Sequence, residues 1–399
     1  MRLMVYSHDA FGLGNLRRML SICEYLLKDQ TDLSILLVSG SPMLQAFRLP
    51  KGLDYIKLPC LNRGQSGTLF AKYLGTELEE TLKWRSHLIH SAALHFKPDV
   101  LLVDKKPYGI QKELLSTLEH LETHQPKTQK VLLLRDILDS PAKTIGEWKR
   151  QGYYQAIQSW YDQVLVVGMA ELFDVAQEYQ FPLPIVKKVH YCGYIRKSPQ
   201  GLNRMELRWF LRIKPSEKLV VVTPGGGEDG YPLVKAYLAG LKYLPNQVKV
   251  RSVILCGPEM PLSQQQDIQT QALQFSGVEV QAFTDNLIGY LDAADAVVSM
   301  GGYNTLTEIL ALDKRTVVVP RITPSQEQLI RAERFMHNGL IRAIHPNHLQ
   351  PKTLMQAVIA QLEDRATPSL ELDFKGLPNI ANQLSNLFLR PPAREPALA

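Results

Sequence analysis

Residues 294–312 read ADAVVSMGGYNTLTEILAL: an apolar run of strand length stops at two glycines, and an amphipathic helical pattern follows. A strand that is buried on both faces of a parallel sheet carries such a continuous apolar run. Gly301 and Gly302 permit a tight turn after it, and we expect the helix to begin near Thr305. The stretch therefore predicts one strand–turn–helix unit of an α/β fold.

The same pattern recurs along the whole chain, with helix-length segments between the apolar runs. The runs of the first half are residues 3–7, 33–39, 99–104, 130–136 and 163–169, and those of the second half are residues 218–227, 250–257, 278–283, 295–302 and 315–320. A polar segment with a proline and a glycine, residues 196–204, separates the two series. We predict two Rossmann-like domains with doubly wound parallel sheets that face each other across a cleft. Their ranges would be 1–197 and 198–370, with a C-terminal helix and flexible tail over 371–399.

Composition narrows the class of protein. The 399 residues, of which 45% are hydrophobic and 21% charged, suit two globular domains. A formal charge of +6 without blocks of lysine or arginine favours an anionic small molecule or anionic lipid over nucleic acid as a partner. The cysteines are far apart in apolar runs, which indicates buried thiols in the reducing cytoplasm: Cys23, Cys60, Cys192 and Cys256. No apolar run approaches the roughly 20 residues of a spanning helix, so we expect at most peripheral contact with the inner face of the membrane.

A second strand-to-helix turn lies in residues 6–20, YSHDAFGLGNLRRML. Gly12 and Gly14 suit a tight turn and Asn15 suits a helix start, but the third glycine of a dinucleotide fingerprint is absent. An ordinary turn explains these three residues. It does not explain the ionisable residues beside them, which are His8, Asp9, Arg17 and Arg18. Cations at a helix start oppose the helix dipole, so a polar or anionic ligand is the alternative.

The Gly301-Gly302 turn predicts an anion site, because a helix start offers amide donors and the positive end of the helix dipole. Two further polar loops are expected at the same sheet edge: Gly225, Gly226 and Gly227 after one strand, and Gln326, Glu327, Gln328 and Arg331 after another. A purely structural alternative exists, since the pairs Thr305/Glu308 and Ser325/Gln328 have the spacing of capping boxes. The repetition beside glycine turns favours a ligand.

Several of these segments resemble the donor-binding half of the GT-B glycosyltransferases. They are FTDNL (283–287), GGYNTLTE (301–308) and Glu327-Gln328, and they resemble in particular the transferases that add N-acetylglucosamine to lipid I in peptidoglycan synthesis. The segments GLGNLRR (12–18), LVDKKPYG (102–109) and LLLRDILD (132–139) resemble a less characterised group of bacterial glycosyltransferases of the same type. The resemblance extends over nearly the whole chain.

This resemblance implies that the protein is an enzyme, a glycosyltransferase that moves a sugar from a UDP-sugar such as UDP-N-acetylglucosamine to an acceptor hydroxyl. It also implies that the reaction inverts the configuration at the anomeric carbon and needs no metal ion or other cofactor. It implies a donor-binding C-terminal domain and an acceptor-binding N-terminal domain, with lipid-linked and polysaccharide acceptors as the candidates. Phe283 and Thr284 would meet uracil, and Glu308 would meet the ribose hydroxyls. The other predicted site residues would contact the diphosphate, the sugar or the acceptor: Gly12, Gly14, Asn15, Gly225, Gly226, Gly227, Gly301, Gly302, Tyr303, Asn304, Thr305, Glu327 and Gln328.

The identity of the base is open. Relatives commonly have a histidine directly after the second glycine, where this chain has Asn15, an amide that cannot accept a proton at neutral pH. Inversion by direct displacement needs a base near the acceptor hydroxyl. Four candidates follow predicted strands: His8, Asp9, Asp104 and Asp136. A hydrogen bond that orders the loop is the alternative role for each of them, and we favour His8 as the base.

Two other functions remain open. UDP-N-acetylglucosamine 2-epimerases share this architecture, and Asn15 is compatible with a sugar-nucleotide-binding protein that has no catalytic activity. His87, His90 and His95 lie in an amphipathic helical pattern without further ligands, so we predict no metal site. The sequence identifies neither the sugar nor the acceptor.

Overall fold

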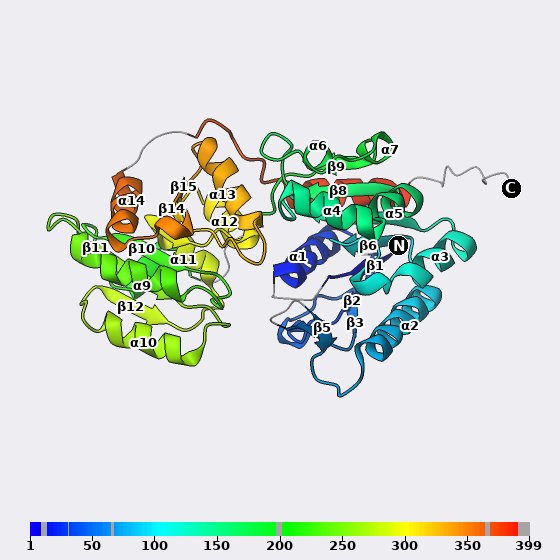
Figure 1. Cartoon of the computed structure of the whole chain (residues 1–399), viewed down its shortest axis with the longest axis horizontal. Coiled ribbons are helices and arrows are strands. Elements are labelled where there is room, and N and C mark those ends of the chain that lie inside the picture. Colours follow the sequence, from blue (N-terminus) through cyan, green and yellow to red (C-terminus); the bar gives the residue numbers. More distant parts are fainter. Residues whose placement is uncertain (9–13, 31, 65–67, 197–201, 364–367, 390–399) are drawn as a thin grey trace. The chain divides into compact units, whose positions relative to one another are not determined.

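A computed structural model describes residues 1–8, 14–30, 32–64, 68–196, 202–363 and 368–389. The predicted site residues Asp9 and Gly12 lie outside the described residues. The chain divides into two compact units (Figure 1): residues 1–195 together with the segment that starts at Lys375, and residues 196–374. The last helix, α15 (Gly376–Leu389), therefore belongs to the first unit, whereas the sequence grouped it with the tail.

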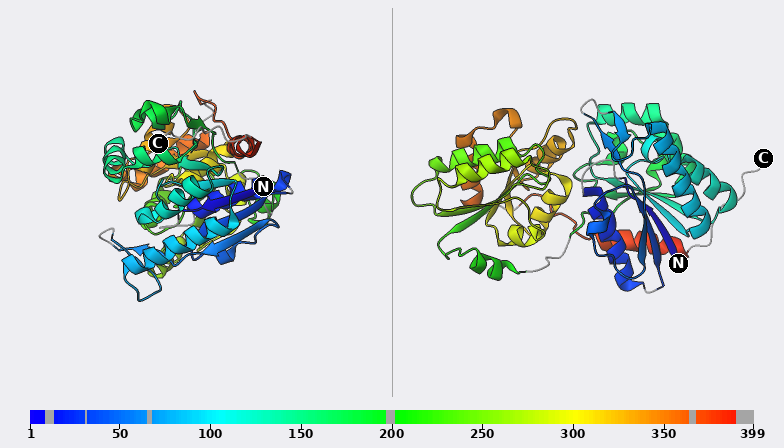
Figure 2. Two further views of the ribbon diagram at one scale, coloured as in Figure 1. Left: turned by 90° about the vertical axis from the view of Figure 1, so that its right-hand side faces the viewer. Right: turned by 90° about the horizontal axis from the view of Figure 1, so that it is seen from below.

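The first unit is built on a seven-stranded sheet in the order β3-β2-β1-β6-β7-β8-β9, and all of its strand pairs are parallel. The strands are β1 (Arg2–Tyr6), β2 (Ser34–Ser39), β3 (Leu53–Lys57), β6 (Val100–Asp104), β7 (Gln129–Arg135), β8 (Gln163–Val167) and β9 (Val189–Tyr191), and β4 (Leu61–Arg63) and β5 (Leu69–Ala71) form a separate antiparallel hairpin. The helices are α1 (Gly14–Asp29), α2 (Leu78–Phe96), α3 (Leu115–His124), α4 (Pro141–Gln151), α5 (Tyr153–Trp160), α6 (Val175–Glu178), α7 (Leu183–Val186) and α15. Helix α1 packs against α15, and α2 packs against α3. Figure 2 shows helices on both faces of this sheet.

The second unit contains a six-stranded sheet in the order β12-β11-β10-β13-β14-β15, again with parallel pairs only. The strands are β10 (Lys218–Thr223), β11 (Val250–Leu255), β12 (Val278–Gln281), β13 (Ala296–Ser299), β14 (Arg315–Val318) and β15 (Arg342–Ala343). The helices are α8 (Arg204–Phe210), α9 (Tyr231–Gly240), α10 (Leu262–Ala272), α11 (Leu287–Ala293), α12 (Tyr303–Ala311), α13 (Glu327–His337) and α14 (Pro351–Glu363).

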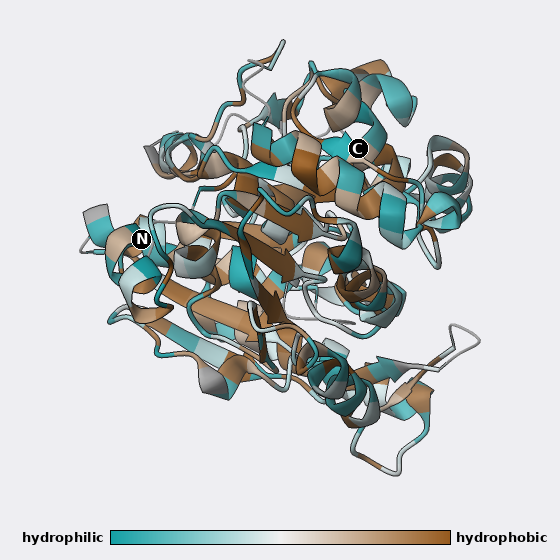
Figure 3. Cartoon of the chain, turned by 90° about the vertical axis from the view of Figure 1, so that its left-hand side faces the viewer, coloured by the Kyte–Doolittle hydropathy of each residue, from teal (hydrophilic) through white to brown (hydrophobic). Residues whose placement is uncertain are grey.

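Strand β10 illustrates why this sheet is covered on both faces. Val220 and Val222 pack into one hydrophobic core, which also contains residues of α9 and α14. Leu219 and Val221 point to the opposite face and pack into a second core with residues of α8, α11 and α12. Successive side chains of a strand alternate between the faces, so a continuous apolar run serves two cores at once. Figure 3 shows the strands as mostly hydrophobic.

In each unit the first strand lies inside the sheet, with its successors on both sides. Strand β1 lies between β2 and β6, and β10 lies between β11 and β13. The prediction of two doubly wound parallel sheets is confirmed. In such sheets ligands bind beyond the carboxyl ends of the strands, where the strand order reverses. The β1/β6 and β10/β13 positions are therefore where sites are expected.

Two predictions from composition can be compared with the structure. All four cysteines are free thiols and are buried, as expected. Among the described helices, none is long and apolar enough to cross a membrane.

Candidate functional site

In the second unit, β10 and β13 end in the same way. Thr223 and Ser299 are aligned neighbours at the ends of the two strands. The Thr223 hydroxyl accepts a hydrogen bond from the Gly225 amide at 3.4 Å, and the Ser299 hydroxyl accepts one from the Gly301 amide at 3.3 Å. Both glycines have left-handed backbone, with φ of 86° and 71°. Two similar glycine turns therefore follow adjacent strands at the reversal of strand order.

Two of these glycines cannot be replaced without displacing a neighbour. A Cβ atom on Gly301 would lie 2.6 Å from Val318 Cγ1, and one on Gly227 would lie 2.3 Å from the backbone oxygen of Cys256. Both positions also have positive φ, which glycine adopts at no steric cost. The glycines thus allow close backbone packing at the carboxyl edge of the sheet.

Helix α12 begins at Tyr303, two residues earlier than the expected start near Thr305. Gly302 is its N-cap and offers no side-chain oxygen to the first turn. The first intrahelical bond runs from the Leu306 amide to the Gly302 oxygen at 2.9 Å. Thr305 lies inside the helix, so it cannot form an N-terminal capping box with Glu308. A helix start of this kind, directly after a glycine turn, suits an anion.

The loop after β14 closes against the same turn. Helix α13 has Gln326 as its N-cap without a side-chain cap, so the second expected capping box is not formed either. The Gln328 side-chain oxygen accepts a hydrogen bond from the Arg321 amide at 3.0 Å. Its Nε2 atom would lie 3.8 Å from a Cβ atom built on Gly302. Gln328 and the start of α12 are therefore neighbours.

Arg331 organises these loops, a role that its position in the sequence did not reveal. Its side chain is fully buried, and Nη1 lies 3.4 Å from the backbone oxygen of Gly301. The guanidinium lies over the ring of Tyr303 at 5.4 Å, and Nη1 is 3.7 Å from Glu327 Oε1. The i,i+4 spacing of Glu327 and Arg331 was the available signal. Arg331 links the glycine turn, the first residue of α12 and the first residue of α13.

The segment after β12 lies two strands away from β10, at the edge of the sheet. Phe283 is half exposed there. The Thr284 hydroxyl accepts a hydrogen bond from the Asn286 amide at 3.1 Å, and the Asn286 side chain caps α11. An exposed aromatic ring and backbone groups at the carboxyl edge of the sheet suit the planar ring of a nucleobase.

In the first unit, Asn15, the second residue of α1, forms hydrogen bonds through both atoms of its side-chain amide. Its Nδ2 atom donates to the backbone oxygen of His8 at 2.8 Å, and its Oδ1 atom accepts from Arg18 Nη2 at 3.2 Å. The same Arg18 nitrogen lies 2.6 Å from Asp104 Oδ1, and both side chains are buried. Arg18 therefore has an anionic partner inside the protein.

His8 lies directly beyond β1, and its side chain is only 6% exposed. Among the described residues, no group forms a hydrogen bond with its Nδ1 atom. Burial lowers the pKa of His8 well below its ordinary value of 6.5, and the charges of Lys105, Lys106, Arg85 and Arg135 lower it further. The imidazole is therefore neutral at pH 7 and can accept a proton. It lines a cavity together with residues of the loop after β6, of β5 and of the α4–α5 junction.

The two described carboxylates that were base candidates do not line this cavity. Asp104 holds Arg18 through one oxygen. Asp136 is buried directly after β7, where its Oδ1 atom accepts a hydrogen bond from the Ile137 amide at 2.7 Å. A Cβ atom on Gly168 would lie 2.7 Å from Asp136 Cβ, so the β7 and β8 loops pack tightly there. In the described part of the chain, no three His, Cys, Asp or Glu side chains are grouped as a metal site.

A comparison with known families finds a match for most of the second unit and the start of α15. Residues 219–383 match the glycosyltransferase family 28 C-terminal domain. The resemblance to glycosyltransferases that the sequence motifs indicated is thereby confirmed for these residues.

Curated relatives are similar to parts of the chain. An uncharacterized glycosyltransferase of Methanopyrus kandleri is 29% identical over 160 residues, which are 40% of this chain and 42% of the relative. The UDP-N-acetylglucosamine–N-acetylmuramyl-(pentapeptide) pyrophosphoryl-undecaprenol N-acetylglucosamine transferase of Bacillus cytotoxicus is 25% identical over 221 residues, 54% of this chain and 59% of the relative. The chain thus spans about half the length of these relatives.

A solved structure covers more of the chain. The crystal structure of MurG from Acinetobacter baumannii superposes with a TM-score of 0.59 at 14% identity, over 97% of this chain and 98% of that one. At this identity the likeness shows the fold. In the family 28 domain, the structure brings together Gly301-Gly302, Tyr303 and Gln328. Glu308 lies one turn further along α12, and Phe283 and Thr284 lie at the sheet edge.

Proposed function

We propose that the protein is a glycosyltransferase that moves a sugar from a UDP-sugar, such as UDP-N-acetylglucosamine, to an acceptor hydroxyl. The observation that carries the proposal is the start of α12 within residues 219–383, where a helix with glycine as its N-cap residue follows a glycine turn at the reversal of strand order. The name of the Bacillus cytotoxicus relative, a transferase that uses UDP-N-acetylglucosamine, supports this donor.

In this proposal each donor group meets residues suited to it. The amides of Tyr303, Asn304 and Thr305 hold the diphosphate, since a helix start stabilises phosphate charge. Glu308 accepts hydrogen bonds from both ribose hydroxyls, and the segment of Phe283 and Thr284 meets uracil. The sugar and the turn around it are contacted by the remaining residues of the predicted set: Gly225, Gly226, Gly227, Gly301, Gly302, Glu327 and Gln328.

The proposed reaction is a direct displacement with inversion. The acceptor hydroxyl oxygen attacks the anomeric carbon, the bond from that carbon to the diphosphate oxygen breaks, and UDP leaves with the electron pair. The hydroxyl proton passes to Nδ1 of His8, which is neutral and has no partner among the described residues. Fixed amides and the α12 dipole stabilise the charge on UDP, so we expect turnover without a metal ion.

The acceptor is proposed to be lipid-linked. The name of the Bacillus cytotoxicus relative includes a pyrophosphoryl-undecaprenol acceptor, and an acceptor of that class would require contact with the inner face of the membrane. A polysaccharide acceptor is the second candidate.

Ligand-dependent thermal stability tests the donor class. UDP at 100 times its dissociation constant should stabilise the protein by about 2.7 kcal/mol, and ADP, GDP and NAD should do less. An equal or larger effect of NAD would contradict the proposal. Turnover separates the alternatives: a transferase consumes donor only with acceptor, an epimerase forms a new sugar without one, and a binding protein releases no UDP.

A further inference from the structure

The cavity beside His8 lies at the reversal of strand order in the first unit, and its walls come from separate parts of the chain. His8 follows β1, and the loop after β6 contributes Lys106, Gln111 and Lys112. Gln151 and Tyr153 come from the α4–α5 junction. A ligand in this position would meet groups from segments far apart in the sequence, which is typical of a binding site in an open α/β sheet.

The loop after β6 is held in place by buried hydroxyl groups. The Tyr6 hydroxyl accepts a hydrogen bond from the Ile110 amide at 3.1 Å and donates one to Glu113 Oε1 at 2.5 Å. Glu113 in turn pairs with Arg85, through Oε2 and Nε at 2.6 Å and through Oε1 and Nη2 at 2.9 Å. Arg85 and Glu113 side chains are fully buried. This network fixes the backbone that carries the cavity residues.

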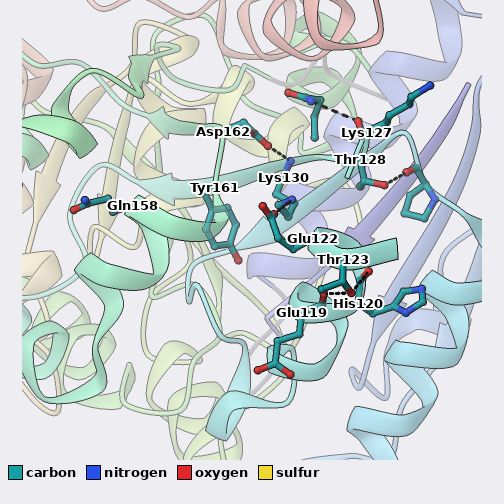
Figure 4. A network of polar contacts seen from close by, with 12 residues as sticks. Glu119, His120, Glu122, Thr123, Lys127, Thr128, Lys130, Gln158, Tyr161 and Asp162 are labelled. Carbon is teal, nitrogen blue, oxygen red and sulfur yellow. Dashed lines mark hydrogen bonds and ion pairs between the residues drawn. The ribbon is translucent and has the colours of Figure 1, made fainter. Parts of the chain in front are cut away.

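A second anchor acts on the same loop from β7 and β8. The Tyr161 hydroxyl donates to the backbone oxygen of Pro107. Its neighbour Asp162 accepts a hydrogen bond from the Lys130 amide at 2.8 Å, as Figure 4 shows, and donates its own amide to the Lys130 oxygen at 2.8 Å. Hydrogen bonds therefore hold the backbone next to Tyr161 against β7, and a hydrogen bond from Tyr161 holds Pro107.

Three residues of this loop have left-handed backbone although none is glycine. Their φ angles are 71° for Lys105, 48° for Gln111 and 65° for Lys112. Such conformations cost free energy for residues with a Cβ atom, and they persist only where the surrounding structure holds them. The positions of Gln111 and Lys112 are thus costly to maintain, and both side chains line the cavity.

The charges around the cavity are mainly positive. Lys106 pairs with Glu147 at 2.8 Å, but both side chains are partly exposed, and such a pair is weak. Within the described residues, Lys112 forms no ion pair, and its side chain is exposed. Lys105 and Lys106 are close enough to His8 to disfavour its protonated form. The cavity therefore presents cations and a buried imidazole nitrogen that has no hydrogen-bond partner among the described residues.

We propose that this cavity binds an acceptor that carries an oxyanion, a phosphate or a carboxylate, which Lys106 and Lys112 hold while a neighbouring hydroxyl of the acceptor donates to His8 Nδ1. Gln111 and Gln151 are placed to bond further sugar hydroxyls. The role of the hydroxyl rests on the proposed transferase function, whereas binding of the oxyanion does not. Lysines bind such groups as point charges, and a rigid loop limits the entropy lost on binding.

The test is a titration of the full-length protein in which the imidazole ¹⁵N resonances of His8 are measured. The protein is first saturated with UDP, so that the start of α12 is already occupied. The probes are glucose 1-phosphate, glucuronic acid and methyl glucoside, which carry a phosphate, a carboxylate and no charge. We expect the charged probes to shift the His8 signals with dissociation constants at least tenfold lower than that of methyl glucoside. The tighter of the two charged probes identifies the source of the oxyanion.

Variants assign the effect to the cavity. Lys112→Gln and Lys106→Gln should each weaken the charged probes at least tenfold, while Lys149→Gln, an exposed lysine of α4 that does not line the cavity, should leave them unchanged. Equal affinity for methyl glucoside, or wild-type affinity in both cavity variants, would overturn the proposal. A separate UDP titration of the wild type distinguishes failure of the donor-site proposal from failure of the oxyanion proposal. If UDP does not bind, the donor site is refuted, whereas the His8 signals still report whether the oxyanion binds.

Discussion

The Asn15 side chain donates a hydrogen bond to the backbone oxygen of His8, with 2.8 Å between nitrogen and oxygen. This bond ties the first turn of α1 to the end of β1. Asn15 also contacts Arg18, which pairs with the buried Asp104. Asn15, at the position where relatives commonly have histidine, therefore holds the backbone of the residue that we propose as the base.

His8→Gln should lower turnover with UDP-sugar and acceptor by a factor of about 100 or more, the usual contribution of a general base. The affinity for UDP should stay within twofold, because His8 and the start of α12, where we propose that UDP binds, are in different units. Initial rates and calorimetric titration with UDP measure the two quantities. Asp136→Asn is the comparison, and an active His8→Gln beside an inactive Asp136→Asn would show that the base is misassigned.

The unfolding free energy should also report on His8. Its folded-state pKa is lowered below the ordinary 6.5, so below pH 6.5 the unfolded chain binds a proton that the folded chain does not. Stability is therefore lost as the pH falls. Between pH 7.5 and pH 5.0 the wild type should lose up to about 2 kcal/mol more than His8→Gln. Urea unfolding of both proteins at each pH measures this, and parallel pH profiles would contradict a buried neutral His8.

Glu308→Gln separates ribose binding from a structural role. A carboxylate can accept from both ribose hydroxyls, whereas an amide offers one oxygen and a mismatched NH2 group. UDP should bind at least about tenfold more weakly, which corresponds to roughly 1.4 kcal/mol. The melting temperature without ligand should change little, since α12 starts at Tyr303 and Glu308 is therefore not at the N3 position that a capping box requires. Glu333→Gln, on the exposed face of α13, is the matched control. Unchanged UDP affinity would remove Glu308 from the donor site.

Alanine substitutions at the two glycines before α12 should differ sharply in their effects on stability and UDP binding. Gly301→Ala combines positive φ with a clash against Val318, so it should destabilise the protein by more than about 1 kcal/mol and weaken UDP binding. Gly302→Ala meets Gln328 Nε2 at 3.8 Å, an ordinary contact, and its φ is −57°. This variant should keep stability within about 0.5 kcal/mol, as for a substitution away from strained positions. Thermal unfolding and UDP titration compare them, and equal effects would disprove the packing argument.

The sequence by itself determined the class of fold and the location of its interior strands. All ten apolar runs form strands of the two sheets. Most of these strands are buried on both faces and therefore need apolar residues at nearly every position, whereas β12 is a half-buried edge strand. The strands that the pattern missed are the short or peripheral ones, β3, β9, β15 and the β4–β5 hairpin. Strand β3 is mostly half-buried, so its sequence, LDYIK, lacks the continuous apolar run. The glycine turns were also predictable, because left-handed backbone and close packing select glycine.

Tertiary structure alone decided how the polar residues of the candidate site are used. The Arg18–Asp104 pair joins residues 86 positions apart, and the burial of Arg331 depends on a turn 30 residues away, so neither contact follows from local pattern. The start of α12 also depends on tertiary packing. Local spacing favoured Thr305 as the cap, but the helix starts at Tyr303, directly after the turn in which Gly301 packs against Val318. The cavity beside His8 required four segments to fold onto one sheet edge. Propensity and periodicity act over a few residues, whereas these arrangements result from packing between segments that only the folded chain brings into contact.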